Sequence, residues 1–307
     1  MVIPAESEPT AAPLTVGKQV IHGLTADPGK DCAPEDTKRG QKNTGLMLLT
    51  VVAGAAVWYW LASGHHWLRF DARISLFLNY LAGRWWTLDR TIKFLQSNDL
   101  PQGTFAMAVF YYVWFQSSPT GAGMTMNDRR ERLLFALLTC VPAVLVARAI
   151  AVSLPYRVRP IFNPDLHLRH AYSFDPTILI SWSCFPSDHA VFYFALATGI
   201  FLINRKAGIL LYLQAALVIC LPRLYLGVHY LSDVLVGTLL GCGFGYLTLS
   251  PALRSLATRH AFRLHERSLG LFHAALFCFA YETAHMYENV RHLGSGLWQV
   301  GRALLHL

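Results

Sequence analysis

Charged residues are scarce in this sequence. They make up 14% of the 307 residues, whereas hydrophobic residues make up 54%. Soluble domains contain about 25% charged residues, so this balance argues against an ordinary soluble protein, and the mean hydropathy of +0.36 agrees. The composition predicts an integral membrane protein that crosses the bilayer several times. Because most of the basic residues flank apolar runs, the net charge of +8 does not indicate nucleic-acid binding.

Paired cysteines are also absent. The six cysteines occur singly, with no Cys-X-X-Cys pair and no histidine at metal-ligand spacing from any of them. A zinc site and a dense disulfide framework are therefore not expected. We predict no metal and no cofactor for this chain.

Uncharged runs predict six membrane-spanning helices and an all-α fold. The first run, from Gly45 to Gly64, has 20 residues, which at about 1.5 Å each cross a hydrocarbon core of about 30 Å. Residues 65–100 mix charged and apolar residues at helical spacing, which favours one or two interfacial helices over a crossing. The other predicted spans are 100–127, 133–152, 190–204, 207–221 and 234–253, with a basic loop at 128–132.

The composition divides the chain into three parts. Residues 1–43 are rich in acidic residues, proline and glycine, and predict a disordered cytoplasmic tail. Residues 44–253 form the six-span domain. Residues 254–307 predict a cytoplasmic or interfacial helical tail, because three arginines recur there at four-residue spacing, as in a helix on an anionic leaflet. The uncharged stretch 268–281 is short for a crossing, which favours an interfacial position or packing against the bundle.

The basic residues also predict the orientation of the spans. Cytoplasmic loops are enriched in lysine and arginine, and six spans place both termini on one side. The side expected to be cytoplasmic carries Lys38, Arg39, Lys42, Arg129, Arg130, Arg132, Arg205, Lys206, Arg254, Arg259, Arg263 and Arg267.

A stripe of small residues follows the sixth predicted span. Gly237, Gly241 and Gly245 recur every four residues and therefore share one helix face. Such a stripe lets two helices approach closely, and we expect it to serve packing within the bundle in preference to dimerisation. The oligomeric state is not indicated.

Three polar clusters fall on the predicted extracytoplasmic face. They are residues 154–160, residues 185–189 and residues 223–233. Charged groups beside apolar spans are costly to place and generally have a partner or a task. Taken singly, the clusters are typical of interfacial anchors, a helix cap and a structural ion pair. Their common location favours one shared site.

The third cluster predicts an oriented nucleophile or base. His229 and Asp233 are four residues apart and so lie on one face of a helix. Asp233 can then hold one ring nitrogen of His229 and stabilise the charge that develops when the other nitrogen attacks.

The other clusters predict an anion site. His189 starts the fourth span, and Ser187 can offer a hydroxyl and a backbone N–H at a helix start, where the dipole favours an anion. Arginines can neutralise phosphoryl oxygens while one histidine attacks and the other protonates the leaving oxygen. The arginines available are Arg157, Arg159 and Arg223. The pattern predicts phosphoryl transfer without a metal.

The order of these motifs resembles a known family. Arg-Pro at Arg159, Pro-Ser-X-His ending at His189, and Arg-X5-His-X3-Asp from Arg223 to Asp233 are similar to the signature of the type 2 phosphatidic acid phosphatase superfamily. The resemblance covers about residues 45–250. It implies that His229 forms a phosphohistidine, that Asp233 supports it, and that His189 protonates the leaving group. It also implies that Ser187, Arg159 and Arg223 bind phosphate and that no metal is required.

Two positions depart from the family pattern. The lysine expected seven residues before Arg159 is Val152, and the serine expected before the arginine of the third motif is Pro222. Arg157 is the first candidate to replace the missing lysine as a phosphate ligand, and Arg148 is a weaker one.

The predicted function is hydrolysis of a lipid phosphate or diphosphate at the outer face of the bacterial cytoplasmic membrane. Asp188 stands where many members have glycine, and the resulting Pro-Ser-Asp-His is similar to bacterial undecaprenyl-diphosphate phosphatases. Undecaprenyl diphosphate is therefore the first expected substrate, followed by phosphatidate or phosphatidylglycerol phosphate, and Asp188 is expected only to shape the site. Two alternatives stay open, a lipid phosphotransferase and a non-catalytic lipid-binding protein with a degenerate site. The partners expected are the lipid and the bilayer.

Overall fold

The described part of the chain is a bundle of helices. The computed structural model describes residues 54, 65–116, 125–172, 174, 175, 177, 182–288 and 293, and these residues contain no strand. The predicted all-α fold is therefore confirmed. The predicted tail at 1–43 and nearly all of the predicted span at 45–64 lie outside the described residues.

Three helical segments within the described ranges are long and apolar enough to cross a membrane. They are α5 (Met126–Ser153), the run Arg205–Tyr225 and the run Leu231–Leu249. The second run joins α7 (Arg205–Gln214), η5 (Ala215–Cys220) and α8 (Leu221–Tyr225), and the third joins α9 (Leu231–Tyr246) and η6 (Leu247–Leu249). Two shorter apolar helices are α6 (Asp188–Phe201) and α11 (Leu269–Ala284). The chain is thus an integral membrane protein, and the count of six spans stays a prediction.

The predicted loop at 128–132 is instead the beginning of a helix. Thr125 caps α5, because its side chain accepts a hydrogen bond from the Asp128 N–H at 3.1 Å. Asp128 then pairs with Arg132 one turn later at 3.1 Å and with Arg254 of α10 (Pro251–Arg267) at 3.3 Å. These local contacts let the helix continue beyond the apolar run, so its polar first turns extend from the end of the bundle.

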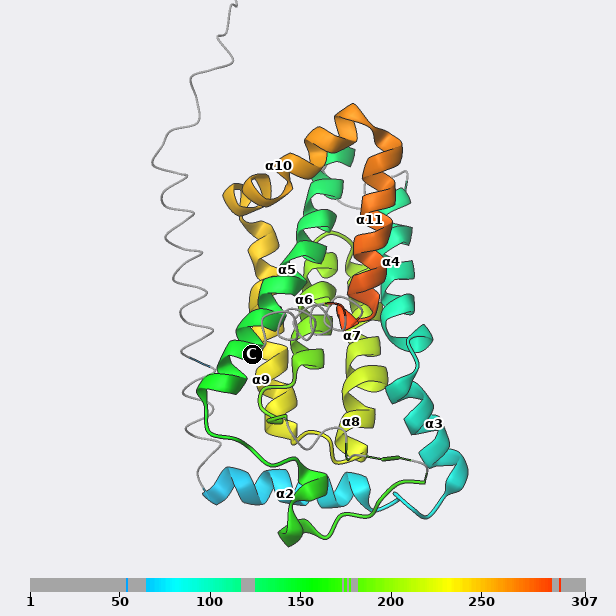
Figure 1. Cartoon of the computed structure of the whole chain (residues 1–307), viewed down its shortest axis with the longest axis vertical. Helices are drawn as coiled ribbons and strands as arrows, with labels where there is room; N and C mark the ends of the chain where they lie inside the picture. The colour runs from blue at the N-terminus through cyan, green and yellow to red at the C-terminus, as the bar shows by residue number, and fades with distance from the viewer. Residues whose placement is uncertain are drawn as a thin grey trace, which may run out of the picture.

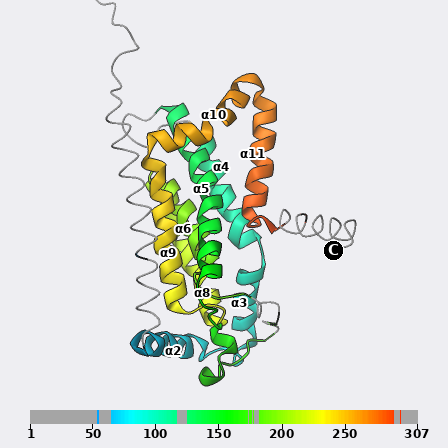
Figure 2. The same ribbon diagram turned by 60° about the vertical axis from the view of Figure 1, so that its left-hand side comes forward.

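Two helices lie across opposite ends of the bundle. α2 (His65–Asn79) crosses one end and α10 crosses the other, as both ribbon views show (Figures 1 and 2). From α2 the chain continues through α3 (Trp86–Ser97), η1 (Leu100–Thr104) and α4 (Phe105–Phe115) along the side of the bundle. Residues 65–100 therefore form two helices.

The C-terminal helix α11 packs against the bundle. Its buried residues Phe272, Leu276 and Ala280 belong to the main hydrophobic core. The helix runs back beside α4 (Figure 1), and its end meets η1 so closely that a Cβ added at Gly103 would lie 1.8 Å from the carbonyl oxygen of Ala284. This contact brings the residues after Ala284 towards the end of α3.

The glycine stripe of α9 packs against α6, as its spacing predicts. A Cβ at Gly237 would lie 2.6 Å from the carbonyl oxygen of Ser187, and one at Gly241 would lie 2.3 Å from that of Val191. Real Cβ atoms essentially never come so close, so only glycine permits this approach of the two helices. The stripe thereby sets the position of Ser187, at the start of α6, relative to α9.

We expect Gly241→Ala to destabilise the protein, because the added methyl group meets rigid backbone. Overpacking of this kind costs about 1–3 kcal/mol. Gly270→Ala in α11 is the matched control, since a Cβ there meets nothing within 4 Å. Thermal unfolding of both purified variants in detergent should show a lower midpoint for Gly241→Ala only. Equal midpoints would contradict the packing described for α6 and α9.

Candidate active site

A cavity of about 610 Å³ gathers most of the predicted site residues. It is lined by residues near the end of α5, at the start of α6, in α8 and in the turn before α9, so segments that are distant in sequence contribute to it. Its lining includes three arginines and three residues of the sequence motifs, which are Arg148, Arg159, Arg223, Asp188, His189 and His229. Of the predicted site residues, Arg159, His189, Arg223 and His229 line this cavity, whereas Arg157, Ser187 and Asp233 do not.

A tight turn between α8 and α9 carries His229. Gly227 adopts φ +70°, and a Cβ there would lie 3.2 Å from the backbone nitrogen of Ile161. The Gly227 carbonyl accepts a hydrogen bond from that same nitrogen at 2.9 Å. The turn is therefore fixed to the segment that follows Arg159, and it buries the His229 side chain.

The hydrogen bonds of His229 define its reactive nitrogen. Nδ1 lies 2.8 Å from the carbonyl oxygen of Cys184 and 3.7 Å from Oδ2 of Asp233. Both of these oxygens only accept, so Nδ1 carries the proton and Nε2 carries the lone pair. Because His229 lines the cavity, Nε2 is the nitrogen available to a bound phosphorus atom.

The environment of His229 favours its neutral form. Burial lowers the pKa of His229 below its usual value, the contact with Asp233 opposes this, and the charge of Arg159 lowers the pKa further. A neutral imidazole is the form that can attack, so the net direction of the shift suits a nucleophile.

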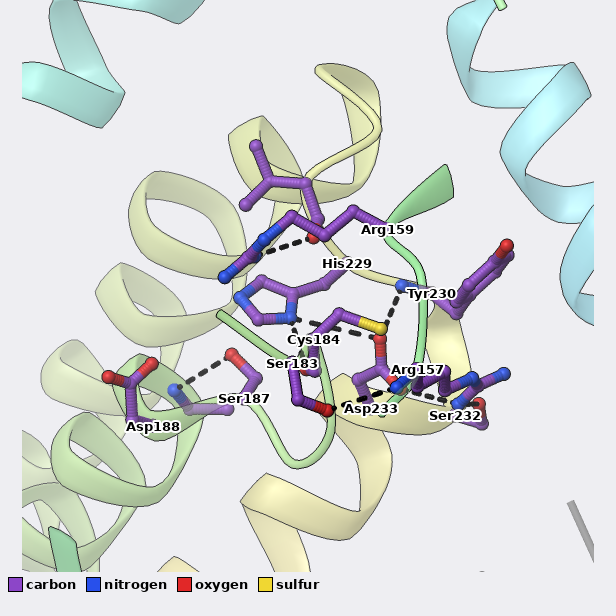
Figure 3. A network of polar contacts seen from close by, with 12 residues as sticks. Arg157, Arg159, Ser183, Cys184, Ser187, Asp188, His229, Tyr230, Ser232 and Asp233 are labelled. Carbon is purple, nitrogen blue, oxygen red and sulfur yellow. Dashed lines mark hydrogen bonds and ion pairs between the residues drawn. The ribbon is translucent and has the colours of Figure 1, made fainter. Parts of the chain in front are cut away.

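Asp233 is completely buried and contacts other groups besides His229. Its Oδ2 accepts the Tyr230 N–H at 2.8 Å, and its Oδ1 accepts a hydrogen bond from Arg157. The shortest contact of His229 Nδ1 is the hydrogen bond to the Cys184 carbonyl oxygen, and Oδ2 of Asp233 faces the same nitrogen from a longer distance. Figure 3 shows this arrangement, with Arg159 beside the His229 ring and Arg157 beside Ser232 and Asp233.

Arg159 and Arg223 supply two buried guanidinium groups to the cavity. Arg159 donates from Nη1 to the Val228 carbonyl at 2.9 Å. Arg223 donates to the Ile219 carbonyl at 2.8 Å and lies 3.4 Å from Oε1 of Gln102. These contacts hold each group in place, and both arginines line the same cavity as His229.

The second motif forms the start of α6. Ser187 is its N-cap, with a side-chain oxygen 3.5 Å from the Ala190 nitrogen. Oδ1 of Asp188 lies 3.3 Å from Nδ1 of His189, and Oδ2 pairs with Arg148. The carboxylate accepts, so Nδ1 of His189 carries a proton and Nε2 is left to exchange one with a ligand. The Asp188 carboxylate thus contacts the His189 ring, whereas the sequence motif predicted only that Asp188 shapes the site.

The two candidates for the missing lysine have different surroundings. Arg148 lines the cavity, pairs with Asp188 and lies over the Trp182 ring at 4.9 Å from its centroid. Arg157 is not among the cavity-lining residues, and both Asp71 and Asp233 pair with it. The predicted phosphate contact of Arg157 is not supported by this arrangement, because two carboxylates already occupy its guanidinium group.

Sequence reasoning missed the far wall of the cavity. This wall consists of Gln96, Ser97, Asp99 and Gln102 from the end of α3 and η1, together with His285, Met286 and Glu288 after α11. Nε2 of His285 pairs with Asp99 at 3.4 Å. No motif marks these residues, and only the packing of α11 against η1 brings them to the site.

The arrangement offers the groups that phosphoryl transfer needs. It combines a histidine with an available Nε2, a second histidine backed by a carboxylate, and three arginines in one cavity. Among the residues that the structure describes, no group of three or more histidine, cysteine, aspartate or glutamate side chains could hold a metal ion.

Comparison with known proteins supports the predicted resemblance. Residues 156–254 match the PAP2 superfamily, which confirms the resemblance over the segment that carries all three motifs. Bacitracin transport permease protein BcrC of Bacillus licheniformis is 44% identical over 57 residues, which are 19% of this chain and 28% of that protein. The match therefore spans less than a third of this relative.

A solved structure gives a weaker likeness. The crystal structure of a transmembrane PAP2 type phosphatidylglycerolphosphate phosphatase from Bacillus subtilis is 21% identical in sequence, with a TM-score of 0.42. The alignment covers 66% of this chain and 93% of that protein. Two parts of the cavity lie outside the segment that matches the family. One is Arg148 of α5, which pairs with Asp188, and the other is the wall formed by α3, η1 and the residues after α11.

Proposed function

We propose that this protein is a membrane phosphatase that hydrolyses a lipid phosphate or diphosphate through a phosphohistidine at His229. The observation that carries the proposal is the placement of His229 in the cavity. Acceptor oxygens face Nδ1 of this residue, so its Nε2 is the nucleophile, and two buried arginines line the same space. The PAP2 superfamily match over the same residues supports this chemistry.

The proposed reaction has two steps. In the first, Nε2 of His229 forms a bond to phosphorus, the bond from phosphorus to the leaving oxygen breaks, and His189, protonated on both ring nitrogens in the complex with the anionic substrate, gives that oxygen its Nε2 proton. Arg159, Arg223 and Arg148 line the cavity and neutralise the non-bridging oxygens. Ser187 caps the start of α6 and is itself buried. In the second, a water oxygen bonds to phosphorus, the proton of that water passes to Nε2 of His189, and the bond from phosphorus to Nε2 of His229 breaks, which restores the His229 lone pair as phosphate leaves.

Asp233 stabilises the intermediate. During attack the imidazole of His229 gains positive charge, and the nearest carboxylate oxygen to its Nδ1 belongs to Asp233 at 3.7 Å. The Tyr230 N–H and Arg157 hold that carboxylate in place, so it needs no reorganisation when the charge appears.

A polyprenyl diphosphate, undecaprenyl diphosphate first, is the proposed substrate. The Pro-Ser-Asp-His motif supports this choice through its similarity to bacterial undecaprenyl-diphosphate phosphatases. The cavity of about 610 Å³ holds a headgroup, and its place between the last turns of α5 and the first turn of α6 lets the lipid tail stay in the bilayer. The proposed location is the outer face of the bacterial cytoplasmic membrane, because the opposite end carries the basic helix α10.

We expect purified protein in detergent to release phosphate from undecaprenyl diphosphate with a chelator present. Its kcat/KM should exceed the values for phosphatidate and phosphatidylglycerol phosphate. Activity that disappears with chelator would contradict the metal-free mechanism, and absence of activity on all three lipids would contradict the phosphatase proposal. Transfer of phosphate to an added lipid hydroxyl, in place of release, would identify a phosphotransferase.

A further inference from the structure

The interfacial helix α2 carries one buried carboxylate. Asp71 has only 1% of its surface exposed, whereas Phe77 on the same helix is 75% exposed. The buried polar residues of α2 are Asp71, Ser75 and Asn79, at four-residue spacing. Among the described side chains of α2, residues 69–79, the inner face is therefore polar, and the outer face carries large apolar side chains together with Arg69 and Arg73. A buried carboxylate is costly unless it is paired, so Asp71 needs a specific partner.

The partners of Asp71 lie beside the catalytic motif. Its Oδ1 accepts the Ser232 N–H at 3.0 Å, and its Oδ2 accepts the Ser232 hydroxyl. The same Oδ2 pairs with Nη2 of Arg157 at 2.8 Å. Ser232 directly precedes Asp233 in the first turn of α9, so Asp71 contacts the start of the helix that carries the supporting carboxylate.

Arg157 links the two carboxylates. Its Nη2 pairs with Asp71 while its Nη1 donates to Asp233 and, at 2.9 Å, to the Ser232 hydroxyl. The guanidinium carbon lies 4.4 Å from the centroid of the Tyr230 ring, which packs against its face. Arg157 is thus held from several directions and transmits the position and charge of Asp71 to Asp233.

The charges of this chain of residues balance the reacting histidine. Asp71, Arg157 and Asp233 together carry one net negative charge, which matches the positive charge that His229 gains during attack. The other described charged or titratable groups around His229 are Arg148 of α5, Arg159, Cys184, Asp188, His189 and Tyr193 of α6, and Arg223 of α8, with Asp99, His285 and Glu288 on the far wall of the cavity. Without the charge of Asp71, the charges of Arg157 and Asp233 cancel. The positive charge on the His229 imidazole is then less stabilised.

The geometry points to Asp71 as a positioning residue that acts on His229 through Arg157 and Asp233 and couples the interfacial helix α2 to the nucleophile. This inference rests on the proposed function. Asp71 does not line the cavity, and it lies outside the segment that matches the PAP2 superfamily. Its effect should therefore fall on kcat and leave KM for the lipid nearly unchanged.

The test compares Asp71→Asn with Asn79→Ala in the full-length protein in detergent micelles containing undecaprenyl diphosphate. Asp71→Asn should lower kcat roughly tenfold. It should also move the acid limb of the kcat/KM profile to lower pH, because loss of a negative charge disfavours protonated His229. Asn79 holds α2 through the backbone of Arg169 and Tyr225 and does not contact Arg157. Asn79→Ala should leave the acid limb in place.

The outcomes separate the inference from the proposed function. Wild-type protein without activity contradicts the proposed function itself. Active wild type with an unchanged kcat and pH profile in Asp71→Asn overturns the inference, as does an identical profile for both variants. If Asp71→Asn does not fold, Asp71→Glu decides. A lower kcat with the wild-type acid limb supports positioning by this carboxylate, and a wild-type kcat overturns it.

Discussion

Replacement of His229 by alanine is expected to lower kcat for phosphate release by roughly four to six orders of magnitude. The reason is that the proposed bond to phosphorus forms at Nε2 of His229, and the neighbouring histidine of the cavity, His189, is needed as the proton donor. The measurement is phosphate release from undecaprenyl diphosphate under single-turnover conditions. Trapping with labelled substrate should give acid-labile phosphoprotein for the wild type and none for His229→Ala.

His260→Ala is the matched control for this variant. His260 is exposed on α10, at the end of the bundle opposite the site, so its loss should leave kcat unchanged. Both variants should elute as the wild type does in size-exclusion chromatography. A folded His229→Ala protein that retains substantial activity, or still forms a phosphoprotein, would rule out His229 as the nucleophile.

Replacement of His189 by alanine is expected to lower kcat by roughly 10²–10⁴-fold on a lipid monophosphate. The loss should be smaller on a lipid diphosphate. Cleavage of the monophosphate expels an alkoxide, which needs a proton, whereas cleavage of the diphosphate expels a phosphate monoester, whose oxygen is far less basic. Comparison of phosphatidate with undecaprenyl diphosphate in the same detergent measures this difference.

The dependence on leaving group distinguishes an acid from a structural role. A general distortion of the site would lower the rates on both substrates equally, and this result would contradict proton donation by His189. Asp188→Asn provides a graded comparison, because Asp188 contacts Nδ1 of His189 and also pairs with Arg148. It should lower the rate on both substrates, since it affects the orientation of His189 and the charge of the cavity together.

Local patterns account for much of what could be predicted. The apolar runs predicted α5 and the run Arg205–Tyr225 closely, because helix formation depends on neighbours within four residues. The same reasoning placed the start of α5 too late. The capping by Thr125 and the pairing of Asp128 with Arg254 lie outside the apolar pattern, and the partner in α10 is distant in sequence.

The candidate site divides in the same way. The sequence indicated the residues of the second and third motifs directly, but the predicted helix face shared by His229 and Asp233 is wrong, because α9 begins at Leu231 and His229 lies in the turn before it. Ser187 and His189 do lie in one helix turn at the start of α6. The role of Arg157 could not be predicted, since its partners are Asp71, 86 residues earlier, and Asp233, 76 residues later. Because Arg157 lies only two residues before Arg159, the sequence suggested that it binds phosphate.

The sequence by itself determined that this protein is a helical membrane protein with three polar motifs of the PAP2 type. Hydropathy and residue spacing are local properties, and they are visible without a fold. Only the tertiary structure decided which cations face the cavity. The packing of α5 against α6 brings Arg148 to Asp188, while α2 brings Asp71 to Arg157. A buried charge must take the partner that packing supplies, and packing joins residues far apart in the chain.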